Sequence, residues 1–195
     1  MRNYGKAWIV LIVIFTVALV ISAGIFGVYI NGYNRAVKLE QNVKQAQADI
    51  ESTLQRRMDL IPNLVNTVKG YAEHEKEIFE SIAKSREKYF QADTTAGKLK
   101  ANSELGGFLS RLLMLQERYP DLKANERFRD LQTQLEGTEN RINVARIRYN
   151  EAAKQLNTYS RQFLGSFFCK RAGVEPVEYF EATEQAKTEV PKVEF

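Results

Sequence analysis

An uncharged apolar run near the start of the chain limits its fold more than any other feature. Residues 7–30 contain no charged residue and no proline. As a helix they would extend ~36 Å, against a bilayer hydrocarbon core of roughly 30 Å. Trp8 lies at one end of the run, and Tyr29 and Tyr33 lie at the other, where membrane interfaces favour aromatic residues. The run therefore predicts a transmembrane helix over 7–30, preceded by a short flank over 1–6.

A cleaved signal peptide is the alternative interpretation of this run. Arg2 and Lys6 would be its positive start, and residues 22–24, Ser-Ala-Gly, would be its cleavage site. The run continues to Ile30, however, so a mature protein would have to expose apolar residues, and an uncleaved anchor is favoured. The orientation stays open, because the basic residues nearly balance: Arg2 and Lys6 before the run, and Arg35, Lys38 and Lys44 after it.

The net charge of +4 overstates the charge of the part of the chain that follows the apolar run. The chain has 28 basic and 24 acidic residues, but two of the basic ones precede the apolar run, so the remainder is nearly balanced. A balanced domain has no strong attraction to a polyanion, and no nucleic-acid partner is expected. One cysteine and one histidine leave little material for disulfides, metal sites or catalytic triads. We therefore expect no catalytic residue, no metal and no cofactor, and a protein that is not an enzyme.

Beyond residue 31, apolar residues recur at alternating steps of three and four, which is typical of helices that pack on one another. The first such line is Ala36, Leu39, Val43, Ala46, Ile50, Thr53, Arg57, Leu60 and Leu64. The longest line, here called the long seam, is Phe128, Leu131, Leu135, Thr138, Ile142, Ala145, Tyr149, Ala152, Leu156, Tyr159 and Phe163. No alternating pattern typical of a strand has a useful length.

Prolines and small polar residues predict where the helices end. Pro62 predicts a kink or a break, because proline removes a backbone donor. A second helical stretch then runs towards Phe90, a polar loop occupies residues 92–98, and a third helix stops near Pro120. Either Asn125 or Pro120 begins the helix that carries the long seam.

These patterns predict an all-α fold with three parts. A transmembrane helix over 7–30 precedes an antiparallel four-helix bundle over 31–164, in which each apolar line finds a partner helix. Residues 165–195 are predicted to be an irregular tail that Tyr179, Phe180 and Phe195 hold in place. An extended coiled coil between chains is the alternative arrangement.

Two stretches of the chain resemble the LemA family of bacterial membrane proteins. The first covers residues 55–65, 68–72 and 74–75, and the second covers residues 135–142 with Ala145-Arg146, Tyr149-Asn150 and Asn157. The pairs Tyr33-Asn34 and Tyr179-Phe180 and the closing Val193-Glu194-Phe195 are also similar to that family. The chain departs from the family after Phe163, where a proline is usual. The resemblance implies a single-pass membrane protein with an antiparallel helical bundle, no known catalytic activity and a poorly defined role.

Charged and polar residues near Pro62 and on the long seam form the candidate site. Arg57 falls on the apolar line of the first helix, where a buried charge needs a partner, and Glu139 is a candidate for it. The cluster is predicted either to bind a partner protein or to be an internal ion pair that fixes helix register. Its members are Arg56, Arg57, Asp59, Asn63, Lys69, Glu139 and Arg141.

The remaining reactive or polar side chains are interpreted as structural. His74 lies among glutamates, but on a helix only Glu77 would share its face, which is too few ligands for a metal. Cys169 is read as a small buried hydrophobic residue. Thr138 and Asn150 are predicted to specify helix pairing.

Three functions remain open from these observations. The first is a helical interaction module anchored in the bacterial cytoplasmic membrane, with lipid around residues 7–30 and an unknown protein or a second copy as its partner. The second is a scaffold that oligomerises through the long seam and organises lipid. The third is an adaptor that presents its C-terminal Val193-Glu194-Phe195 to a groove. The side of the membrane that holds the bundle is not predicted.

Overall fold

The computed structural model describes residues 4–180, apart from the side chains of residues 4–7 and of Val10. Between these limits the chain is helical and contains no strand, as the periodicity predicts. The helices are α1 (Tyr4–Lys69), α2 (Lys76–Gln91), α3 (Thr95–Met114), the 3-10 turn η1 (Leu115–Glu117), α4 (Pro120–Ala124), α5 (Glu126–Arg161) and α6 (Phe163–Ala172). The predicted C-terminal adaptor motif at residues 193–195 and the first three residues lie outside the described part.

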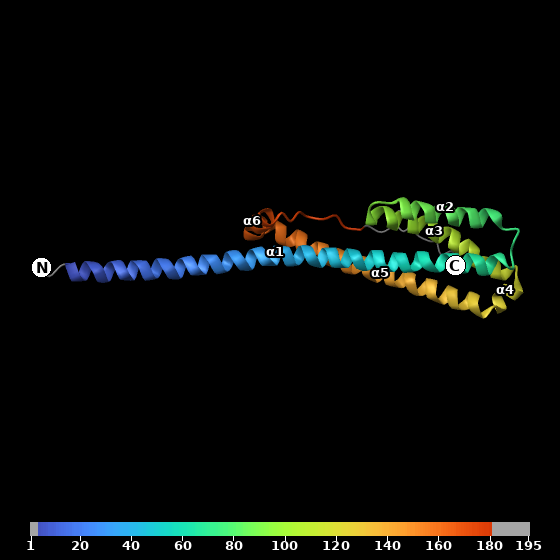
Figure 1. Ribbon diagram of the computed structural model, residues 1–195, viewed down its shortest axis with the longest axis horizontal. Helices are drawn as coiled ribbons and strands as arrows, with labels where there is room; N and C mark the ends of the chain where they lie inside the picture. Colours follow the sequence, from blue (N-terminus) through green and yellow to red (C-terminus); the bar gives the residue numbers. More distant parts are fainter. Residues whose placement is uncertain (1–3, 181–195) are drawn as a thin grey trace, which may run out of the picture. The chain divides into compact units, whose positions relative to one another are not determined.

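The described chain forms two compact units that share α1 and α5. One unit contains the chain up to Val43 together with Ala152–Glu178, and the other contains Lys44–Glu151 and the residues after Glu178. In the second unit α1, α2, α3 and α5 form the expected antiparallel bundle. Figure 1 shows α2 and α3 side by side, as expected for two helices joined by a three-residue connection.

α1 runs without a break from the apolar run into the bundle, and it also passes through Pro62. The predicted break at this proline is therefore wrong, whereas the kink predicted as its alternative is compatible with the continuous helix. A proline cannot donate to the carbonyl of the residue four positions earlier, which here is Met58. Arg86 of α2 supplies the missing donor, because its Nε lies 3.4 Å from the Met58 carbonyl oxygen. The chain leaves the helix only after Lys69, at Gly70.

The core of the bundle follows the predicted apolar lines closely. Ile50, Leu54, Met58 and Leu64 of α1 are fully buried, and so are Leu105 and Leu112 of α3. The long seam is buried from Phe128 to Tyr159 except at Ala152, whose place in the core Ala153 takes. The last residue of the seam, Phe163, is 93% exposed. Because the chain itself covers this seam, the seam is not available for oligomerisation unless the bundle opens.

Two helix starts have the caps that their sequences suggest. Asn125 begins α5, since its Oδ1 accepts a hydrogen bond of 2.9 Å from the amide of Phe128. Thr94 caps α3 by accepting from the amide of Gly97 at 3.1 Å. The predicted loop over 92–98 is therefore too long, because α3 already begins at Thr95. Pro120 instead occupies the first turn of the short α4.

A polar cluster fixes the beginning of α3 to α1. The buried Thr95 hydroxyl donates to the carboxylate of Glu51 and accepts from Nε2 of Gln47 at 2.9 Å. Lys98 pairs with the same carboxylate at 3.2 Å. The hydrogen bond from Thr95, followed by Lys98, lowers the pKa of Glu51. The carboxylate is therefore charged at neutral pH and joins the two helices.

The tail is more regular than the sequence predicts. Residues 163–172 form α6, so the irregular segment begins at Gly173 rather than at residue 165. Gly173 ends the helix in a left-handed conformation with φ of 69°, and the amide of Val174 donates to the Cys169 carbonyl oxygen at 2.9 Å. This is the pattern of a Schellman motif, in which glycine is strongly favoured.

Candidate functional site

Arg57 and Glu139 form an ion pair between α1 and α5 within the bundle. The Arg57 side chain is 7% exposed, whereas that of Glu139 is 51% exposed. Gly106 of α3 faces the guanidinium, since a Cβ there would lie 3.9 Å from Nη2. The pairing predicted for these two residues is present, and three helices meet around the arginine.

The pair is poorly hydrogen-bonded for a buried charge. Nε of Arg57 has no hydrogen-bond partner among the described residues. Burial lowers the pKa of Arg57 to about 10, so the guanidinium is still charged at neutral pH and its desolvation is unfavourable. A site of this kind fits a device that fixes helix register better than one that adds stability.

The other predicted site residues do not gather around this pair. Arg56 donates to Gln134 at 3.3 Å, and Asp59 accepts from Gln55 at 2.8 Å, both at the surface. Asn63 is exposed, and the ammonium of Lys69 lies 5.4 Å from the centre of the Phe79 ring. These residues are distributed along α1 and do not form a single site with Arg57.

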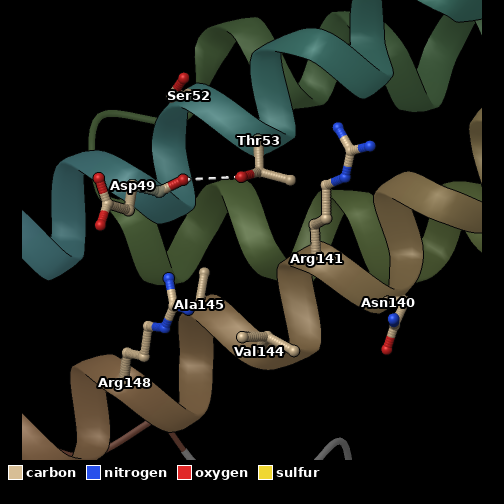
Figure 2. A pocket seen from close by; sticks show the side chains of 8 residues that line it. All are labelled: Asp49, Ser52, Thr53, Asn140, Arg141, Val144, Ala145 and Arg148. Atoms are coloured by element: carbon tan, nitrogen blue, oxygen red, sulfur yellow. Dashed lines mark hydrogen bonds between the residues drawn. The ribbon is translucent and has the colours of Figure 1, made fainter.

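Arg141 lines an open groove between α1 and α5. The groove has a volume of about 400 Å³ and is lined by Asp49, Ser52, Thr53, Asn140, Arg141, Val144, Ala145 and Arg148. Figure 2 shows Arg141 and Arg148 extending from α5 towards α1. The Thr53 hydroxyl donates to the backbone oxygen of Asp49 at 2.8 Å, which occupies this hydroxyl within its own helix. The groove thus has two cationic side chains and one carboxylate around the partly exposed Val144.

Two asparagines of α5 bind the backbone of the segment that follows α6. In one unit, Asn157 donates to the carbonyl oxygen of Val177 at 2.8 Å and accepts from its amide at 2.9 Å. In the other, Asn150 makes the same two bonds to Phe180, each at 2.9 Å. The Phe180 ring also lies 4.3 Å from that of Tyr149, centre to centre. The role predicted for Asn150 in helix pairing is therefore wrong.

The spacing of the two asparagines explains why both can act. Seven residues of an α-helix rise ~10.5 Å, and three residues of an extended chain cover ~10 Å. The three-residue step from Val177 to Phe180 therefore matches the seven-residue step between Asn157 and Asn150 on α5. The sequence signal for this arrangement is the recurrence of asparagine at positions 143, 150 and 157, and these residues were not predicted to bind a backbone segment.

Replacing Asn157 with alanine is expected to release Val177 from α5. The hydrogen bonds that join the amide and carbonyl groups of Val177 to Asn157 are both lost, which corresponds to ~1.4 kcal/mol of local stability. Hydrogen exchange at the Val177 amide should become about tenfold faster. The exposed Asn143 on the same helix is the matched control, and Asn143→Ala should leave this rate unchanged. An unchanged rate in Asn157→Ala would show that the amide is protected by other means.

The surroundings of the remaining reactive or polar candidates do not indicate a binding or catalytic site. His74 is exposed in the connection between α1 and α2, so the helical spacing assumed for it does not apply. Cys169 is buried in α6 as predicted, and burial raises the pKa of its thiol. Thr138 is buried on the long seam and donates to the Leu135 carbonyl of its own helix at 2.7 Å, and its role in helix pairing stays a prediction. Within the described residues, no three His, Cys, Asp or Glu side chains are grouped as metal ligands.

Comparison with known proteins identifies relatives of two kinds. The LemA family model matches residues 46–195. Protein LemA of Metamycoplasma hominis is 23% identical over 178 residues, which cover 90% of this chain and 81% of that protein. Magnetosome protein MamQ of Magnetospirillum gryphiswaldense is 25% identical over 174 residues, or 76% of this chain. Magnetosome protein MamQ 2 of Paramagnetospirillum magneticum is 25% identical over 175 residues. The chain spans 64% of the length of each of these two magnetosome proteins.

Proposed function

Because this chain belongs to the LemA family, we propose that it is a membrane-anchored helical interaction protein without catalytic activity. In this proposal residues 7–30 cross the cytoplasmic membrane of a bacterium once, and the bundle holds a partner protein close to the bilayer. The anchor and the partner surface are supported by different observations, so each has its own experiment.

The exposure of the apolar run is the observation that supports a membrane anchor. α1 is long and apolar enough to cross a membrane, and none of its most apolar window is buried within the described chain. Trp8, Phe15 and Phe26 are each at least 65% exposed. A continuous apolar surface of this size is unfavourable in water, and lipid would remove it from water. The unbroken helix from this run into the bundle also favours an uncleaved anchor over a signal peptide.

The groove between α1 and α5 is the proposed partner surface. It is open, it is lined in part by the exposed Val144, and it carries Arg141 and Arg148 with Asp49 as the single acidic lining residue. Charges at the rim of an interface steer and select the partner more than they add affinity. A helical or extended segment that carries acidic residues fits this surface best.

Charge reversal in the groove tests the partner part of the proposal. A photoreactive amino acid at Val144 should crosslink the full-length protein to a partner in intact cells. The double variant Arg141→Glu/Arg148→Glu should reduce this yield several-fold, because two attractive contacts become repulsive. Arg127→Glu, at an exposed position of α5 outside the groove, is the matched control. Equal yields from both variants would refute the groove as the partner surface.

Three further observations complete the test. Release of the protein from membranes by alkaline carbonate would refute the anchor whatever the crosslinks show. A crosslinked product that contains only this chain would favour self-association, the alternative that the exposed Ile147 next to Val144 on α5 supports. Protease accessibility of the bundle in sealed cells would then determine on which side of the membrane partners are available.

A further inference from the structure

α6 packs on α1 at the end of the apolar run. The Phe168 ring lies over Gly32 so closely that a Cβ at this glycine would collide with it. The same ring makes an edge contact with Tyr29, with 6.0 Å between the ring centres. Nε of Arg171 lies 3.4 Å from the Tyr29 hydroxyl. Tyr29 belongs to the proposed membrane span, so α6 lies at the depth where that span ends.

The opposite face of α6 is apolar, and none of the described residues 4–180 covers it. Phe163 is 93% exposed, Leu164 is 53% exposed and Phe167 is 55% exposed. At 100° per residue these three side chains fall within one arc of about 100°, whereas Gly165, Phe168 and Cys169 are buried on the other side. Three large apolar side chains on one short helix are more than the scattered surface residues of an ordinary protein.

The charged residues of α6 and the residue that ends α5 are of one sign. From residue 161 to residue 174 the sequence contains Arg161, Lys170 and Arg171 and no acidic residue. Arg35, on α1 just after the span, lies over the Tyr159 ring at 4.8 Å from its centre. Aromatic and aliphatic residues beside basic ones are the composition of helices that lie in the headgroup region of a bilayer.

We propose that α6 is a second membrane contact, which lies in the plane of the bilayer surface with Phe163, Leu164 and Phe167 inserted among the lipids. This inference rests on the proposed anchor, because the anchor places Tyr29 and its neighbour α6 at the interface. A lipid surface is the occupant that these observations favour, since the buried face of α6 packs beside Tyr29, where the proposed span ends, and large apolar side chains stand beside basic ones on α6. The basic residues at the end of α6 then face lipid phosphates.

Tryptophan fluorescence can test the two contacts separately. The chain has one tryptophan, Trp8, so quenching of native fluorescence by brominated phosphatidylcholine, mixed with phosphatidylglycerol, reports on the anchor alone. The variant Trp8→Phe/Phe167→Trp reports on α6 in the same full-length protein and vesicles. Its emission should be quenched several-fold relative to vesicles without bromine. Trp8→Phe/Phe163→Trp should behave in the same way, at a position so exposed that the substitution leaves packing intact.

The matched control is Trp8→Phe/Phe90→Trp. Phe90 is a half-exposed aromatic residue on α2, a helix for which no lipid contact is proposed, and its replacement should not be quenched. Quenching of Trp8 without quenching in either α6 variant would overturn this inference and leave the anchor standing. No quenching of Trp8 would refute the anchor itself. A blue-shifted but unquenched α6 variant would show that protein rather than lipid covers this face, which also overturns the inference.

Discussion

Glu139→Ala is expected to lower the free energy of unfolding by ~2 kcal/mol, whereas Arg57→Met is expected to leave it unchanged or raise it by ~1 kcal/mol. Removing Glu139 leaves a guanidinium that is 7% exposed without its only counter-ion among the described residues. An uncompensated buried charge typically costs 3–5 kcal/mol, and the loss here is smaller because half of the Glu139 side chain is in water. Methionine fills the same space without a charge, and it leaves Glu139 free to be solvated.

Urea denaturation of the detergent-solubilised protein, followed by circular dichroism, measures both changes. Glu136→Ala is the matched control, since Glu136 is exposed on the same helix and accepts a surface hydrogen bond from Gln132. A loss of 2 kcal/mol or more in Arg57→Met would show that the pair stabilises the bundle. If Arg57→Met keeps its stability but loses the crosslinked partner, the pair belongs to the binding surface.

Gly165→Ala is expected to detach α6 and to lower the free energy of unfolding by about 3 kcal/mol. A Cβ at this position would collide with the backbone carbonyl group of Tyr159. Backbone atoms of a packed helix cannot move aside as a flexible side chain can. The destabilisation is therefore expected at the upper end of the range for overpacked sites. Phe168 and Cys169 are the buried side chains of α6, so both should become exposed when this helix detaches.

The reactivity of Cys169 with a thiol reagent measures this detachment directly. Cys169 is buried in the native protein and should react many times faster in Gly165→Ala. Gly137→Ala in α5 is the matched control, because nothing lies within 4 Å of the added methyl group there. It should stabilise the helix by ~0.5–1 kcal/mol. Slow reaction of Cys169 in Gly165→Ala would contradict the proposed close packing of α6.

Features that depend on local periodicity were predictable from the sequence. The apolar run, the line from Ala36 to Leu64 and most of the long seam needed only the spacing of apolar residues. The ion-pair partner of Arg57 was also predictable, because a charge on an apolar line requires a nearby opposite charge. Asn125 followed by an acidic residue was one of two sensible starts for α5.

Features that depend on distant contacts were not predictable in the same way. Pro62 is compatible with a continuous α1 because Arg86, from another helix, reaches the freed carbonyl group. α6 is short and contains Gly165, so its local preference for a helix is weak, and its packing on α1 supplies what the propensity lacks. The groove around Arg141 exists only once α1 and α5 lie together.

The paired amide contacts of Asn150 and Asn157 recognise peptide groups and not side chains. Any residues other than proline could occupy positions 177 and 180 and still offer the same amide and carbonyl groups. The number of residues between them is fixed, because helix rise and extended-chain length must match over this interval. These two amide contacts therefore place little constraint on the side chains at positions 177 and 180, whereas a single inserted or deleted residue between them would put one of the two contacts out of reach.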